Sequence, residues 1–250
     1  MKDLLTQNYL TGDYLEYQAR YRQKMRKSDE ALLAMIKDML ARYFPGRSGV
    51  RLADIGCSTG NFLLHLRHAE LGLTLFGRDA YPEVIDNCQA TPELAGIDFG
   101  LWDVREASPE RFDILVLNAM LGYFKADELA NVLANLGASL VPGGLFLAFA
   151  WLNPFEQEIY ITERSPSHPD GAVLNIHSYA LFSRLMNANG FEPPQFTPFE
   201  IPIDLPRPTA PDDPRTYTET TLDGRRLNFR GSIFQPWCHV CVRKKHDPFI

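Results

Sequence analysis

Apolar residues near the start of the chain recur at steps of three and four positions. These positions are Leu32, Leu33, Ile36, Leu40 and Tyr43. This spacing places their side chains along one face of a helix. Ser28 suits the start of such a helix, and Pro45-Gly46 suits its end. The pattern predicts an amphipathic helix within an N-terminal helical cap, residues 1–48.

From about residue 49 onwards, short apolar runs alternate with turns and amphipathic segments. Strands are predicted at 50–55, 73–77, 98–102, 112–117 and 145–150, and helices at 61–69, 82–89 and 126–139. Strands that alternate with helices indicate parallel βαβ units. We therefore predict an α/β fold with a Rossmann-like, doubly wound, mostly parallel seven-stranded sheet, whose cofactor-binding core covers residues 49–152.

The remaining residues, 153–250, differ in pattern. Prolines and polar residues in 153–175 predict a long connection or lid. A helix is predicted at 178–189, and 193–214 is proline-rich and irregular. The segments 216–221 and 226–242 predict antiparallel strands joined by a turn. We expect this part to form a lid and an antiparallel elaboration that completes the sheet.

The clearest chemical signal lies between the first predicted strand and the helix after it. The segment reads Asp54-Ile55-Gly56-Cys57-Ser58-Thr59-Gly60-Asn61. Glycines allow the backbone of such a turn to approach a ligand closely, and the following helix presents free N–H groups. The spacing differs from the G-x-G-x-x-G of dinucleotide sites. The carboxylate two residues before the first glycine suits a ligand that carries an ammonium group.

Three further polar residues follow predicted strands. Asp79 ends the second strand and can accept hydrogen bonds from both hydroxyls of a ribose. Asp103 follows the third strand and can accept a proton from an adenine amino group, while Asn118 closes the fourth. The carboxyl ends of parallel strands share one edge of a sheet, which is where open α/β sheets bind ligands.

These segments together resemble the class I S-adenosylmethionine-dependent methyltransferase family. The Asp54–Gly60 loop resembles the first motif of the family, and Val141-Pro142-Gly143-Gly144-Leu145 resembles the turn before its fifth strand. The resemblance covers about residues 49–151. It implies that S-adenosyl-L-methionine is the cofactor, with Gly56 and Gly60 near its methionine part, Asp79 at the ribose and Asp103 at the adenine. The full set expected to bind it is Asp54, Gly56, Cys57, Ser58, Gly60, Asn61, Asp79, Ala80, Asp103, Val104, Asn118 and Ala119.

The methyl acceptor is expected to be a small molecule or a glycan that offers a hydroxyl group. An alcohol must lose its proton on methylation, and histidine suits that task near neutral pH. His177 is the first candidate for the base, because it ends the predicted lid, and His168 is the second. Residues expected to line an acceptor pocket are Tyr123, Trp151, Asn153 and Tyr160.

Charge and cysteine content limit the alternatives. The net charge of −6 argues against a broad phosphate-binding surface, so nucleic acid is an unlikely partner. An RNA or protein methyltransferase would need the basic residues between Arg225 and Lys245 to form one face. A nicotinamide-dependent oxidoreductase should show G-x-G-x-x-G, and a catalytically silent cofactor-binding subunit would have no open acceptor pocket.

Cys238 and Cys241 should point to opposite faces of a strand, so no metal site is expected. The absence of a signal peptide or an apolar span leads us to expect a cytoplasmic protein.

Overall fold

The computed structural model describes residues 12–165 and 168–246, except for the side chains of 12–14, 16–17 and 168–170. The chain begins with two helices, α1 (Gly12–Gln23) and α2 (Lys27–Tyr43). The predicted amphipathic helix is confirmed as α2, which buries Leu32 and Ile36. α1 lies within residues 1–48, where a helical cap is expected.

Helices and strands alternate through the middle of the chain. The strands are β1 (Val50–Ile55), β2 (Leu73–Asp79), β3 (Asp98–Leu101), β4 (Phe112–Asn118) and β5 (Leu140–Asn153). Between them lie α3 (Asn61–His68), α4 (Pro82–Ala90), α5 (Ala126–Ser139) and two short 3-10 helices, η1 (Pro92–Leu94) and η2 (Leu121–Tyr123). Neighbouring strands among β1 to β5 pair in parallel, as the βαβ pattern predicts.

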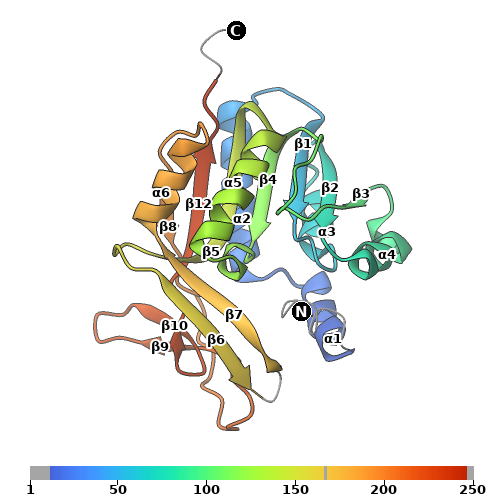
Figure 1. Cartoon of the computed structure of the whole chain (residues 1–250). Helices are drawn as coiled ribbons and strands as arrows, with labels where there is room; N and C mark the ends of the chain where they lie inside the picture. Colours follow the sequence, from blue (N-terminus) through green and yellow to red (C-terminus); the bar gives the residue numbers. More distant parts are fainter. Residues whose placement is uncertain (1–11, 166–167, 247–250) are drawn as a thin grey trace.

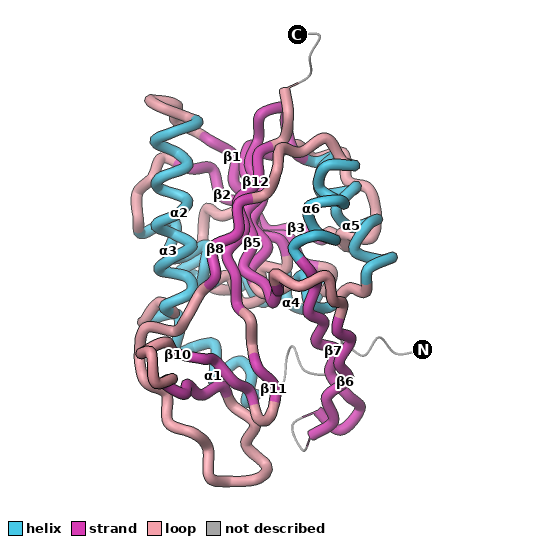
Figure 2. Tube along the Cα trace, turned by 90° about the vertical axis from the view of Figure 1, so that its left-hand side faces the viewer, coloured by secondary structure: helices cyan, strands magenta, loops and turns pink. Residues whose placement is uncertain are grey.

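The main sheet runs in the order β3-β2-β1-β4-β5-β12-β8. Its last two members, β12 (Trp237–Arg243) and β8 (Gln195–Pro198), come from the C-terminal part, and β12 is antiparallel to both β5 and β8. Helices α2 and α3 cover one face of this sheet, and α5 and α6 (Tyr179–Ala188) cover the other (Figure 2). The fold is thus the predicted Rossmann-like, mostly parallel α/β sheet with an antiparallel C-terminal addition.

Two hydrophobic cores fill the space between the sheet and its two helix layers. Along β4, Leu115 and Leu117 belong to the core under α5 and α6, while Ile114 and Val116 belong to the core under α2 and α3. A central strand that is apolar on both faces must be covered on both sides. Cys238 and Cys241 of β12 are likewise divided between the two cores, so their thiols lie on opposite faces, as predicted.

The structure corrects the expectation for residues 153–175. Instead of a long irregular lid, β6 (Ile159–Ser165) and β7 (His168–Ser178) form an antiparallel hairpin. A separate small sheet contains β9 (Thr216–Thr220), β10 (Arg226–Arg230) and β11 (Ile233–Phe234). Both extend below the main sheet (Figure 1). The stretch 193–214, expected to be irregular, also contributes β8 to the sheet edge.

Among the helices of the described residues, none is both long and apolar enough to cross a membrane.

Candidate active site

The loop from β1 to α3 forms a tight turn at the carboxyl edge of the sheet. Gly56, Ser58 and Gly60 all have positive φ, at 71°, 50° and 70°. The backbone N–H groups of Gly56 and Cys57 both donate to the carbonyl of Arg78, at 2.7 and 3.1 Å. The loop is thereby tied to the end of β2, which brings the first two predicted motifs together.

The two glycines of this loop serve different purposes. A Cβ on Gly56 would lie 2.5 Å from Sδ of Met120, in the segment after β4, and Gly56 lines a cavity. A Cβ on Gly60 would lie 2.7 Å from Cδ1 of Leu94, in the apolar core. Gly56 therefore lines the first cavity, whereas a side chain on Gly60 would point into the apolar core.

Asp79 organises the site at the end of β2. Its carboxylate accepts hydrogen bonds from the backbone N–H of Ser58, at 3.1 Å, and of Tyr81, at 3.3 Å. Burial raises the pKa of this carboxyl group. Asp79 also lines a cavity, so it is placed to accept hydrogen bonds from a ligand as well.

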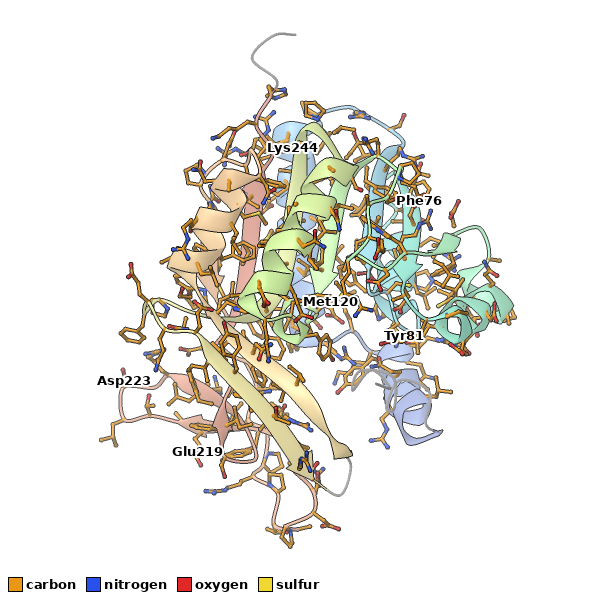
Figure 3. The ribbon with its side chains drawn as sticks, viewed as in Figure 1. Phe76, Tyr81, Met120, Glu219, Asp223 and Lys244 are labelled. Atoms are coloured by element: carbon orange, nitrogen blue, oxygen red, sulfur yellow. The ribbon has the colours of Figure 1, made fainter. Side chains whose placement is uncertain are left out.

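This first cavity has a volume of about 60 Å³. It lies at the lower edge of the sheet, where Figure 3 shows Tyr81 and Met120. Five of the predicted cofactor residues line it, namely Gly56, Asp79, Ala80, Asp103 and Val104, together with Ile55, Tyr81, Trp102, Arg105, Met120, Tyr123 and Phe124. Apolar and aromatic side chains around two carboxylates match the needs of a purine and a ribose.

Asp103 is already held by a neighbour. Arg105 donates to both of its carboxylate oxygens and forms an ion pair with it at 2.7 Å. Hydrogen bonds from Arg105 lower the pKa of Asp103. Asp103 therefore carries a negative charge at the mouth of the cavity, with its oxygens shared between Arg105 and any adenine amino group.

A cluster of buried carboxylates lies beside the loop. Asp29, Asp54 and Asp79 are only 4%, 3% and 4% exposed. Oδ1 of Asp54 has no hydrogen-bond partner, while Nδ2 of Asn118 donates to Asp29 at 2.9 Å. Burial and the charges of Asp29 and Asp79 raise the pKa of Asp54 well above its usual range. Asp29 was missed in the sequence, where nothing distinguishes it from other acids in the first turn of a helix.

This cluster suits the expected cofactor. Three acidic groups close together and away from water are stabilised by a positive ligand. S-adenosylmethionine carries both an ammonium and a sulfonium group, whereas a dinucleotide brings a negatively charged pyrophosphate. The unpartnered oxygen of Asp54 also leaves one buried acceptor for a ligand N–H. The residues present therefore fit the cofactor.

The other predicted cofactor residues support the loop or the cap. Nδ2 of Asn61 donates to the carbonyl of Gln18 at 2.8 Å, and its Oδ1 accepts from Arg22, so Asn61 anchors α1. Cys57 is buried in the core beneath the loop. The backbone N–H of Ala119 donates to Phe149, and Ala119 lines a second cavity rather than the first.

The second cavity is larger, with a volume of about 350 Å³. It is lined by the segment after β4, the ends of β5 and β12, the β6–β7 hairpin and the small sheet, through Ala119, Gly122, Tyr123, Ala150, Trp151, Ala172, Leu174, Thr216, Arg230, Gln235 and Trp237. Tyr123 lines both cavities. The two spaces therefore share a wall next to the cofactor loop.

Of the four predicted acceptor residues, Tyr123 and Trp151 line this second cavity. Asn153 does not, because its side chain bonds Phe155 N–H and the carbonyls of Gln157 and His177. Tyr160 lies in β6, half exposed, and lines neither cavity. Tyr123 and Trp151 thus keep their expected position, while Asn153 stabilises the turn before β6.

The geometry around His177 does not suit a general base. The ring is fully buried and lines neither cavity. Nε2 lies 2.9 Å from the carbonyl oxygen of Phe124, and Nδ1 lies 2.8 Å from Oε2 of Glu158. Because both ring nitrogens face acceptors, neither is free to take a proton from a substrate. His168, the second candidate, begins β7, and its side chain lies outside the described part.

We expect His177→Ala to lower the free energy of unfolding by about 2–4 kcal/mol, through a lost buried side chain and an unpaired carbonyl. Turnover per folded molecule should remain, because His177 contacts neither cavity. Thermal unfolding and initial rates at a temperature where the variant is folded measure the two effects. A stable variant that turns over slowly would restore His177 to the mechanism.

The basic residues between Arg225 and Lys245 do not share one face. Arg225 and Arg226 pair with Glu200 and Asp204 beside the small sheet. Lys244 instead donates to two backbone carbonyls near the end of α5. In Figure 3, Asp223 and Lys244 mark opposite ends of the molecule. The cluster therefore lacks the contiguous surface that an RNA or protein methyltransferase would need.

Comparison with known proteins identifies the family. A methyltransferase-domain family model matches residues 20–195. Magnesium-protoporphyrin O-methyltransferase from Rhodobacter capsulatus is 30% identical over 146 residues, which cover 54% of this chain and 63% of that protein.

Solved structures agree on the fold. An amino pentose methyltransferase from Micromonospora echinaspora, with its cofactor bound, has a TM-score of 0.57 and 17% identity, with 92% of this chain and 96% of that chain covered. The 1,6-didemethyltoxoflavin-N1-methyltransferase of Burkholderia thailandensis also has a TM-score of 0.57 and 17% identity. That comparison covers 98% of this chain and 91% of that chain. The chain spans less than two thirds of the length of the curated relatives it matches, and it belongs to the class I S-adenosylmethionine-dependent methyltransferase family.

Proposed function

We propose that this enzyme transfers the methyl group of S-adenosylmethionine, in line, to a small-molecule acceptor bound in the second cavity. The observation that carries the proposal is the wall shared by the two cavities, which contains Tyr123. Methyl transfer requires the acceptor atom and the methyl group to be held in line and close together. Adjacent cavities that share Tyr123 as a lining residue support such an arrangement.

The volume and the lining of the second cavity favour a small acceptor over a macromolecule. A volume of about 350 Å³ lies within the range of small-ligand sites. Trp151, Trp237 and Tyr123 give the cavity aromatic walls, which suit a compact, partly apolar molecule. The magnesium-protoporphyrin, amino pentose and toxoflavin-precursor methyltransferases found as relatives all have small-molecule acceptors in their names.

When bound, S-adenosylmethionine supplies an activated methyl group on its sulfonium. Asp79 would hold the ribose of its nucleoside part, the Gly56 turn would lie at its methionine part, and Asp54 and Asp29 would balance its positive charge. The described residues that line the second cavity include no His, Asp or Glu. Among these described residues an ordinary sugar hydroxyl would find no base. They therefore suit an acceptor that is nucleophilic without one, such as an acidic hydroxyl group or an amine.

The proposal is tested by incubating the enzyme with methyl-tritiated S-adenosylmethionine and pooled small molecules, and separately with total RNA and protein. We expect label in the small-molecule fraction only. Transfer to RNA or protein with none to small molecules would overturn the proposal and favour the macromolecular alternative. Binding of the cofactor with no transfer to any pool would favour a catalytically silent subunit.

We expect Ala172→Phe to abolish acceptor turnover while leaving the dissociation constant of S-adenosylmethionine within about twofold. Ala172 and Leu174 of β7 line the second cavity, and a phenyl ring at 172 would fill it. Val173 lies between them in the same strand and does not line it, so Val173→Phe is the matched control. Initial rates and titration calorimetry measure the two quantities. Unchanged turnover in Ala172→Phe would place the acceptor elsewhere.

A further inference from the structure

Two buried polar atoms in the lining of the second cavity have no hydrogen-bond partner. They are Nε1 of Trp151 and Oε1 of Gln235. The two residues are only 6% and 3% exposed. Buried polar atoms in folded proteins are nearly always paired, so an unpaired one calls for a physical reason. Two of them in the wall of one cavity point to a ligand that pairs with both.

The fold holds both side chains in place by their backbones. Trp151 lies opposite Trp237 in the antiparallel pairing of β5 with β12. Gln235 lies just before β12, where its N–H donates to the carbonyl of Asn228 at 2.8 Å and its carbonyl accepts from Trp237 N–H at 2.9 Å. The main chain of Gln235 is thus fixed between β10 and β12. Its side-chain oxygen is left without a partner.

The charged side chain in the cavity lining is already engaged. Arg230 of β10 forms a two-point ion pair with Glu163 of β6, at 3.0 and 3.1 Å. This pair also links the small sheet to the hairpin, the two elements that close the cavity. Because Glu163 balances the charge of Arg230, the cavity does not require a fully charged acceptor. The two buried polar atoms of the lining without a partner are thus one donor and one acceptor.

We propose that Trp151 and Gln235 select a planar acceptor molecule, with the indole N–H donating to a carbonyl or ring heteroatom and the Gln235 oxygen accepting from an N–H or O–H of that molecule. The indole rings of Trp151 and Trp237 meet edge to face at 75°, so a planar molecule can stack on the face of one ring. This specificity rests on the proposed function, because it names the class of molecule that occupies the acceptor site.

The experiment is a calorimetric titration of the full chain, saturated with S-adenosylhomocysteine, with three planar probes. 2-Quinolone offers a carbonyl and an N–H, 1-methyl-2-quinolone offers only the carbonyl, and naphthalene offers neither. For the unmodified chain we expect affinity to fall in that order. Equal affinity for all three probes, or no binding of 2-quinolone, would overturn the proposal.

Single substitutions distinguish the proposed hydrogen bond of Trp151 from that of Gln235. Trp151→Phe keeps an aromatic ring and should weaken 2-quinolone about tenfold while changing naphthalene by less than about twofold. Gln235→Leu should weaken 2-quinolone about tenfold and leave 1-methyl-2-quinolone unchanged. Gln195→Leu, at an exposed position of β8, is the matched control and should change nothing. Equal weakening of all probes would indicate general damage to the cavity and contradict the proposal.

Stability gives an independent readout. Because Oε1 of Gln235 is buried and has no partner in the protein, Gln235→Leu, which nearly keeps the side-chain volume, should not lower the melting temperature. A clear loss of stability would show that the amide serves the fold instead. Failure of the proposed function is distinguishable, because it would appear as no binding of S-adenosylhomocysteine or no labelled product. The probes still report on the cavity when the cofactor is left out.

Discussion

Replacing Asp79 by alanine is expected to weaken S-adenosylmethionine binding about 100-fold, which corresponds to about 3 kcal/mol. Two effects combine. The carboxylate lines the first cavity, where it is placed to accept from the ribose hydroxyls. It also accepts from Ser58 N–H and so holds the loop in its turn. Titration calorimetry with S-adenosylmethionine and S-adenosylhomocysteine measures the loss.

Asp86→Ala provides the matched control for that experiment. Asp86 is exposed on α4, the helix after β2, and its loss removes the same charge from the same region. We expect it to leave the affinity within about twofold, because exposed charges separated from a ligand by water contribute little. If both variants weakened binding equally, Asp79 would act only through net charge and not through direct contact.

Asp54→Asn is expected to have opposite effects on stability and on binding. The amide removes a buried charge that lies near Asp29 and Asp79, so the unliganded protein should gain about 1–2 kcal/mol of unfolding free energy. Affinity for the cofactor should fall at least about tenfold, because the ligand ammonium loses a charged acceptor. Thermal unfolding with and without S-adenosylmethionine measures both effects. A variant less stable than the parent without ligand would contradict the assignment.

The same carboxylates give binding a defined pH dependence. The pKa values of Asp29, Asp54 and Asp79 are all raised above the ordinary 3.8. The folded, unliganded protein therefore holds more protons than the unfolded chain, and its stability falls as pH rises from about 3.8 through the raised values. A cationic ligand favours the ionised carboxylates, so its binding should strengthen over that window and release protons. Calorimetry in two buffers with different heats of ionisation detects this release.

The central fold could be predicted because its signals are local. β1 and its loop, the Asp79 strand end and the Pro142-Gly143-Gly144 turn are each read from a few consecutive residues. The β6–β7 hairpin was missed because prolines around it predict irregular chain and its strands are only half buried. β8 ends in a proline that only an edge strand tolerates, and edge position cannot be read from one sequence.

The site was predictable only in part, because some of its residues come together only in the folded chain. Asp54 and Asp79 lie at strand ends in recognisable motifs, whereas Asp29 reaches the site from a helix far away in the sequence. His177 looked suitable by position, but its role depends on Glu158 and on the carbonyl of Phe124, which no pattern reveals. Gln235 was recognised only in the structure, where its buried side-chain oxygen has no hydrogen-bond partner.

One part of the second cavity's lining lies outside the two main cores, which has a consequence for how this protein can diverge. Its walls on the hairpin and the small sheet, at Ala172, Leu174, Thr216 and Arg230, belong to neither core cluster. Substitutions there change what the cavity admits without disturbing the packing that positions Asp54 and Asp79. Descendants of one ancestral chain can therefore acquire new acceptors while inheriting the same cofactor site, and sequence similarity in the core will overstate how alike their substrates are.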